Sequence, residues 1–150
     1  MSKGFTIKIN FLLDKQISIK NALLYANFSD ADEDWVFIDK KTIISYDVLV
    51  FRIKDIETNT FRYFFGENVN ASVEDNEITI DTISKKVFYK QIKVKNPYLK
   101  QLKEINKKIS SLEAAQLLGI TFDRFLELKE LKREKYFLYM KNLLRLREEE

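Results

Sequence analysis

The hydrophobic pattern of this chain changes period at its single proline, Pro97, and this change limits the folds available to it. Before the proline, apolar and polar residues alternate, and every odd position from Phe5 to Leu13 is apolar. After it, apolar residues recur at spacings of three and four, as in Leu99, Leu102, Ile105 and Ile109. A period of two indicates a strand with one buried face, and the wider spacing indicates a helix. The sequence therefore predicts an α+β protein, with a β-domain at 1–95 and a helical interaction segment at 96–150.

Further apolar runs between polar segments predict the other strands of the β-domain, namely 16–20, 34–39, 48–56, 60–65, 77–83 and 87–95. Their spacing of about ten residues is typical of an antiparallel sandwich or barrel. We expect a hairpin loop at 56–60 and the next turn at the Gly-Glu-Asn sequence of 66–68. Residues 21–28 fit a short helix as an alternative to a strand.

The segment 110–128 has the spacing of two helices joined at a corner. Ser110 and Glu113 form a capping-box pattern that predicts the start of a helix, and Gly119 predicts its end, because glycine adopts the left-handed conformation at little cost. Thr121 then caps a second helix. We expect this helix to run over 122–147, with Ile120, Phe125 and Leu128 filling the angle between the two helices.

This segment resembles the helix-turn-helix of excisionase-like and MerR-like DNA-binding modules. The matching residues are the Glu-Ala-Ala run and the Leu-Gly-Ile turn, Glu113, Ala114, Ala115, Leu118, Gly119 and Ile120. The resemblance implies DNA binding, with base-reading positions at Thr121, Phe122, Asp123, Leu126 and Glu127. These residues depart from the family, since carboxylates and large apolar groups offer few donors to base edges and Arg124 is the one good candidate. The alternative is a helical hairpin that packs on protein.

The composition excludes much catalytic and metal chemistry. The chain has no Cys and no His, which removes thiol nucleophiles, disulfides and the commonest metal ligand and general base. Its three glycines are too few and too dispersed for a phosphate-binding loop. We therefore expect no enzymatic activity, no catalytic residues, no cofactor and no metal. Without an apolar run of membrane-spanning length or a secretory signal, we expect a cytoplasmic protein, or a virion component if a phage encodes it.

Two weaker site patterns remain. Asp30, Asp32 and Asp34 match the first three ligand positions of a calcium loop, but Trp35 and Lys41 replace its glycine and its bidentate glutamate, so a solvated acidic turn is the preferred interpretation. Aromatic residues also alternate with cations at 62–64 and 88–90. This pattern fits a platform on which single-stranded nucleic acid stacks, and it fits the two faces of ordinary strands better.

Our leading hypothesis is a non-enzymatic interaction or assembly protein, such as a structural or accessory protein of a phage. The predicted last helix has apolar groups on several sides, which requires burial on several sides, either by the chain itself or by a partner or a second copy. The residues expected to anchor a protein interface are Phe125, Leu126, Tyr136, Phe137, Tyr139, Met140 and Leu143. We expect lysine at positions 136 and 140 to dissociate the assembly and to leave the β-domain folded.

The alternative hypothesis is a DNA-binding regulator or packaging factor that uses the helix-turn-helix-like segment. Residues 95–150 hold 13 Lys or Arg against 9 Asp or Glu, whereas residues 1–94 hold 13 against 14. This difference is compatible with phosphate contacts and with an ordinary solvated helical face. The candidate phosphate contacts are Lys107, Lys108, Arg124, Lys129, Lys132 and Arg133. Such binding would weaken steeply with salt.

Overall fold

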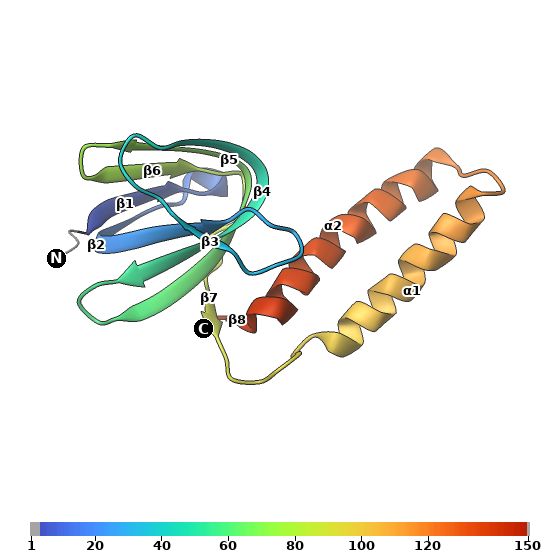
Figure 1. Cartoon of the computed structure of the whole chain (residues 1–150). Coiled ribbons are helices and arrows are strands. Elements are labelled where there is room, and N and C mark those ends of the chain that lie inside the picture. Colours follow the sequence, from blue (N-terminus) through green and yellow to red (C-terminus); the bar gives the residue numbers. More distant parts are fainter. Residues whose placement is uncertain (1–3, 150) are drawn as a thin grey trace. The chain divides into compact units, whose positions relative to one another are not determined.

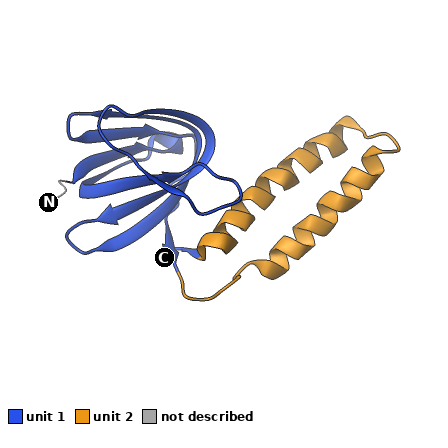
Figure 2. Ribbon diagram, viewed as in Figure 1, with its two compact units in different colours: residues 1–91, 146–150 blue, residues 92–145 orange. Residues whose placement is uncertain are grey.

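The computed structural model describes residues 4–149, which divide into two compact units (Figure 2). The first is the β unit, made of the chain up to Gln91 together with the segment that begins at Leu146. The second is the helical unit, Ile92–Arg145. The sequence analysis expected the boundary between the two segments at 95/96. The main difference is at the C-terminal end of the chain, where the segment that begins at Leu146 belongs to the β unit and not to the helical unit.

The β unit contains a mixed sheet of eight strands (Figure 1). The strands are β1 Phe5–Asn10, β2 Gln16–Asn27, β3 Trp35–Phe37, β4 Ile43–Asp55, β5 Thr60–Glu74, β6 Glu77–Asp81, β7 Tyr89–Gln91 and β8 Leu146–Glu148, and a 3-10 turn, η1, spans Leu12–Asp14. β1, β2, β4, β5 and β6 pair in a closed circuit in which only the β1–β6 pair is parallel. In a closed circuit of five strands, neighbouring strands cannot all be antiparallel, so one pair must be parallel. The expectation of a purely antiparallel sheet was therefore wrong.

Three long strands, β2, β4 and β5, bend within the sheet, and the bends explain two wrong predictions. β5 continues through the turn expected at 66–68: Asn68 has a φ of 47°, and a Cβ at Gly66 would lie 2.5 Å from Val69 Cγ2. The glycine therefore permits a close approach inside a strand and does not end it. Of residues 21–28, all but Phe28 belong to β2 and none to a helix, and Asn21, with a φ of 54°, lies at the bend. The hairpin loop expected at 56–60 is confirmed between β4 and β5.

The core of the β unit is built from the alternating apolar residues of these strands. Ile7, Ile9, Leu24 and Phe51 are fully buried. Phe64 has its ring centroid 5.6 Å from that of Phe11 in an edge-to-face contact. Burial of each such side chain stabilises the fold by about 1.5–3 kcal/mol, so the period-two pattern is the main source of the stability of this unit.

The helical unit is an antiparallel hairpin of α1 Leu99–Gln116 and α2 Phe122–Leu144 (Figure 1). Leu102, Ile105 and Ile109 of α1 pack against Leu128 of α2. The helix start predicted at Ser110 was wrong, because the apolar face of α1 continues through this residue and the helix begins at Leu99.

The last helix ends before the predicted position of 147. Arg145 adopts a left-handed conformation with a φ of 56°, and Leu146 begins β8, which pairs with β7. Leu146 is fully buried, and this burial outweighs the continued helical pattern of the sequence. Within residues 4–149, neither helix is both long and apolar enough to cross a membrane.

Candidate functional site

Large apolar side chains are exposed where α1 turns into α2. Leu117 and Leu118 are 88% and 92% exposed, Phe122 is 73% exposed, and Phe125 and Leu126 are each 46% exposed. We call these five residues the apolar tip. Scattered exposed leucines are ordinary, whereas these five large apolar residues all lie within residues 117–126.

Backbone hydrogen bonds and a helix cap hold the apolar tip in shape. The amides of Leu117, Leu118 and Gly119 bond to the last carbonyls of α1 at 3.0–3.3 Å. Gly119 then reverses the chain with a φ of 101°, as its sequence position predicted. The predicted cap is confirmed, since the Thr121 hydroxyl accepts from the Arg124 amide at 3.3 Å. The exposed leucines are therefore presented by an ordered turn.

The first turns of α2 carry two apolar faces. Phe122, Phe125 and Leu126 occupy positions i, i+3 and i+4, which lie on one side of a helix. Leu128 is 5% exposed and lies on the other side, against α1. Phe125 was expected to fill the angle between the helices, but it is 46% exposed and is not part of the cluster around Leu128. The hairpin packs through the face that carries Leu128.

The other predicted interface residues continue along α2 with increasing burial. At 100° per residue, Tyr136 and Met140 fall on the same side of the helix as Phe122. Tyr136, Phe137, Tyr139 and Leu143 are half-buried, and Met140 is fully buried. Met140 is therefore not available to a partner, and its assignment as an interface anchor is withdrawn. Tyr139 packs against the hydrophobic cluster of the hairpin.

The cations proposed to contact DNA do not form one surface. Lys132 Nζ lies 3.7 Å from Glu113 Oε2, and Arg133 Nη1 lies 3.2 Å from Glu130 Oε1, so two of the six are paired with carboxylates. By helix geometry, Lys107 is on the side of α1 opposite its buried residues, while Lys129 shares the outward side of α2 with Phe122. Lys107, Lys108, Arg124 and Lys129 are all exposed. A duplex could therefore not meet all six at once.

The acidic turn predicted at Asp30, Asp32 and Asp34 contains side-chain hydrogen bonds. The side-chain amide of Asn27 donates to the carbonyl of Asp32 at 3.0 Å, and the Asp32 amide donates to Ser29 Oγ at 2.9 Å. Within the described part of the chain, no three acidic side chains group closely enough to bind a metal ion.

The aromatic residues suggested as a stacking platform are mostly in the core. Tyr63, Phe64 and Phe88 are all buried. A different group was missed: the Arg52 guanidinium carbon lies 4.5 Å from the Tyr25 ring centroid and 4.7 Å from that of Trp35. These residues are far apart in sequence and meet only through the pairing of β2, β3 and β4. The regular alternation of residues 48–56, which predicted β4, could have placed Arg52 on the outer face but not its neighbours.

A mixed β-sheet followed by a hairpin of two helices defines an α+β protein with two compact units. The chain matches the family described as UU051 N-terminal domain over residues 6–87 and the uncharacterised protein UU051 C-terminal domain over residues 99–149. It is 32% identical to the uncharacterized protein UU051 of Ureaplasma parvum serovar 3, over 97% of this chain and 89% of that protein. The chain therefore belongs to the UU051 family. The excisionase-like resemblance of 110–128 is not supported by these comparisons.

Proposed function

We propose that this protein is a non-enzymatic interaction protein that docks onto another protein through the apolar tip. The observation that carries the proposal is the exposure of Leu118 and Phe122, at 92% and 73%, on an ordered turn. Such side chains gain free energy only when a partner removes them from water, at roughly 25 cal/mol per Å² of buried apolar surface. They contribute little to the fold of the chain itself.

The shape of the apolar tip favours a concave partner. Phe122, Phe125 and Leu126 have the i, i+3, i+4 spacing of helices that insert into an apolar groove. A narrow, protruding turn fills such a groove, whereas two protruding turns would bury little area against each other. We therefore infer a groove on a different protein rather than a second copy of this chain.

The charges beside the apolar tip specify the rim of that groove. Asp123 and Glu127 lie beside the exposed apolar residues on α2, together with the cations Arg124 and Lys129. The two signs are balanced, so a complementary groove would carry both signs on its rim. Tyr136, Phe137 and Leu143 lie further along α2 and are half-buried, so we assign them a secondary contribution.

DNA binding through this hairpin remains the alternative proposal. The turn at Gly119 and the cap at Thr121 support it, since both are parts of a helix-turn-helix. However, Asp123 and Glu127 occupy the expected base-reading positions and would repel phosphates. The two proposals differ in salt dependence: phosphate contacts weaken steeply with added salt, and apolar docking does not.

Site-specific photocrosslinking tests the proposal. The full chain is expressed at native level in cells of the source organism with a photoreactive phenylalanine analogue in place of Phe122. A matched control chain carries the same analogue in place of Lys107, on the outward side of α1. We expect one discrete protein adduct from position 122, absent from position 107 and lost when Leu118→Gln is added. Adducts of equal yield from both positions, or none from position 122, would refute docking at the apolar tip. An adduct of twice 17.9 kDa would replace the proposed partner with a second copy.

A further inference from the structure

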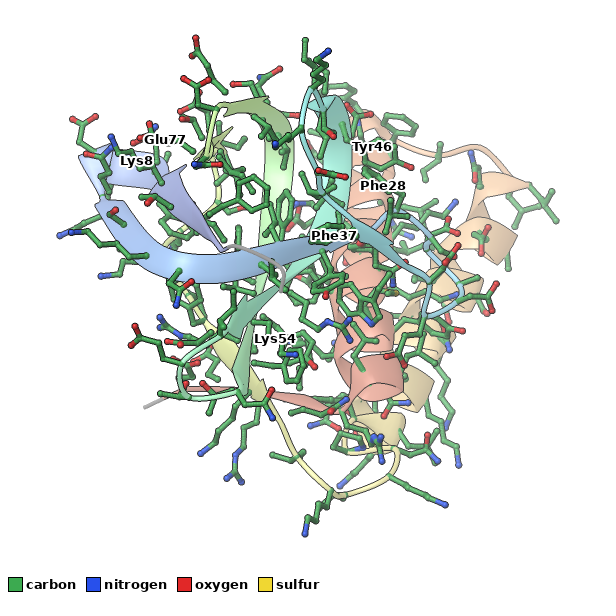
Figure 3. All side chains as sticks on the ribbon, turned by 60° about the vertical axis from the view of Figure 1, so that its left-hand side comes forward. Lys8, Phe28, Phe37, Tyr46, Lys54 and Glu77 are labelled. Carbon is green, nitrogen blue, oxygen red and sulfur yellow. The ribbon has the colours of Figure 1, made fainter. Side chains whose placement is uncertain are left out.

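A second surface, on the β unit, combines aromatic rings with unpaired cations. Its members are Tyr25, Trp35, Phe37, Arg52, Lys54 and Phe61, which we call the aromatic face. The sheet register places them together: Tyr25 pairs with both Phe37 and Arg52, and Lys54 pairs with Phe61 in the next row. Figure 3 shows Phe37 and Lys54 on the same side of the sheet. The pairing of the strands therefore places the two cations of the aromatic face beside its four aromatic rings.

Arg52 is held by rings and not by an anion. Its guanidinium carbon lies 4.5 Å from the Tyr25 centroid, 4.7 Å from that of Trp35 and 5.1 Å from that of Phe61. Its Nε is buried and has no hydrogen-bond partner among residues 4–149. A buried, unsatisfied donor of a charged group is costly, and stacking on rings leaves the in-plane donors of a guanidinium unused. This geometry is typical of a site that receives an anion.

Lys54 adds a second cation without a carboxylate. Its Nζ lies 5.9 Å from the Phe61 centroid, and within the described residues no ion pair involves it. Arg52 and Lys54 are two residues apart on β4, which corresponds to about 7 Å along a strand. Successive phosphates of an extended nucleic-acid strand can span this separation. Two carboxylates that adjoin members of the aromatic face in the sequence accept hydrogen bonds from other groups: Glu33 accepts from Trp35 Nε1 at 2.9 Å, and Asp55 accepts from the amide of Glu57 at 3.0 Å.

The exposed rings of the aromatic face indicate which kind of anionic ligand it binds. Phe37 and Phe61 are 43% and 40% exposed, and Trp35 and Tyr25 are half-buried beside them. An acidic peptide would use the cations but would leave the flat rings exposed. Unpaired bases stack on such rings while their phosphates meet the cations, and a duplex cannot do so because its bases are already stacked. We propose that the aromatic face binds single-stranded nucleic acid.

This site is separate from the apolar tip, so its test does not depend on protein docking. Trp35 is the single tryptophan of the chain and lies within the aromatic face, where it serves as an intrinsic reporter. The probe is an oligothymidylate of about 15 nucleotides, titrated into the full chain at about 50 and 200 mM salt while Trp35 fluorescence is recorded. We expect saturable quenching that weakens with salt, and no comparable quenching by a duplex of the same length.

Variants assign the binding to the aromatic face. Phe37→Ala and Phe61→Ala should each weaken binding roughly tenfold or more, because each removes a stacking surface. Lys54→Gln should lower the slope of log affinity against log salt by about 0.7, as expected for the loss of one phosphate contact. The control is Ile43→Ala, since Ile43 is 85% exposed on β4 outside the aromatic face, and it should bind as the parent does. No quenching of a folded chain, equal binding of the duplex, or unchanged affinity in both phenylalanine variants would overturn the proposal.

Discussion

Arg62 of β5 binds the carboxylate of Glu149 through two nitrogens, across 87 residues of sequence. Arg62 Nε lies 3.0 Å from one carboxylate oxygen and Nη2 lies 2.9 Å from the other. The same guanidinium lies 3.9 Å from the Phe88 ring centroid, and the Glu149 amide donates to the Phe88 carbonyl at 2.9 Å. The sequence predicted a helix that continues to residue 147 at this end of the chain. As far as Glu149 it is instead fixed to the β unit.

We predict that Glu149→Gln lowers the free energy of unfolding by ~1 kcal/mol, at the upper end for partly exposed pairs, because the contact is bidentate. Urea unfolding followed by circular dichroism measures the change. The control is Glu77→Gln, which breaks the single contact of 3.3 Å with Lys8 between two more exposed side chains. That variant should change stability by less than half as much. Equal effects would mean that the bidentate geometry contributes nothing.

Gly66→Ala should destabilise the β unit by overpacking a buried part of β5. A Cβ at this position would lie 2.5 Å from Val69 Cγ2 and 3.2 Å from the Phe51 ring. Overpacking of this kind costs ~1–3 kcal/mol. Gly119→Ala offers a comparison, because its Cβ meets no atom within 4 Å and the cost there is conformational strain alone. A thermal melt of both variants tests this, and an unchanged midpoint for Gly66→Ala would show that the bend in β5 adapts.

Thr121→Ala should destabilise the hairpin by ~1 kcal/mol, because it removes the hydroxyl that accepts from the Arg124 amide in the first turn of α2. Thr121→Ser keeps the hydroxyl and should lose much less. Hydrogen exchange of the amides at 122–126 measures the effect locally: they should exchange faster in the alanine variant. If alanine and serine variants exchange alike, the cap does not order the apolar tip.

Met140→Lys and Phe122→Lys should behave in opposite ways, although both residues lie on the same side of α2. Met140 is fully buried, so a lysine there buries a charge and should cost several kcal/mol. Phe122 is 73% exposed, and its replacement should leave the melting temperature nearly unchanged. The sequence-based expectation was that lysine at positions 136 and 140 leaves the β-domain folded, and the burial of Met140 argues against it at position 140. If the melting temperature of Met140→Lys is close to that of the parent chain, the sequence-based expectation is correct and the structural argument is wrong.

The elements that could be predicted from the sequence are those determined by residues close together along the chain. Alternation gave β1 and β4, the spacing of Leu102, Ile105 and Ile109 gave α1, and Gly119 with Thr121 gave the turn between the helices. These signals depend on residues a few positions apart. These signals can therefore be interpreted without knowledge of the rest of the fold.

The features missed by sequence analysis depend on distant contacts. Residues 146–148 continue a helical pattern but form β8, because β7 offers a pairing edge and Leu146 becomes buried. The Gly-Glu-Asn sequence at 66–68 has turn composition but bends a continuous strand. Arg52 meets Trp35 only through the pairing of β4, β2 and β3. The hypotheses of a phage origin and of an assembly role stay predictions.

The sedimentation of the chain in an extract of its own cells tests protein docking most directly. The parent chain is compared with the double variant Leu118→Gln and Phe122→Gln, whose changes are at exposed positions and should leave the fold intact. We predict that the parent sediments as a complex well above its own 17.9 kDa at moderate salt and that the double variant sediments as the free chain. The same sedimentation for both chains would contradict docking through the apolar tip.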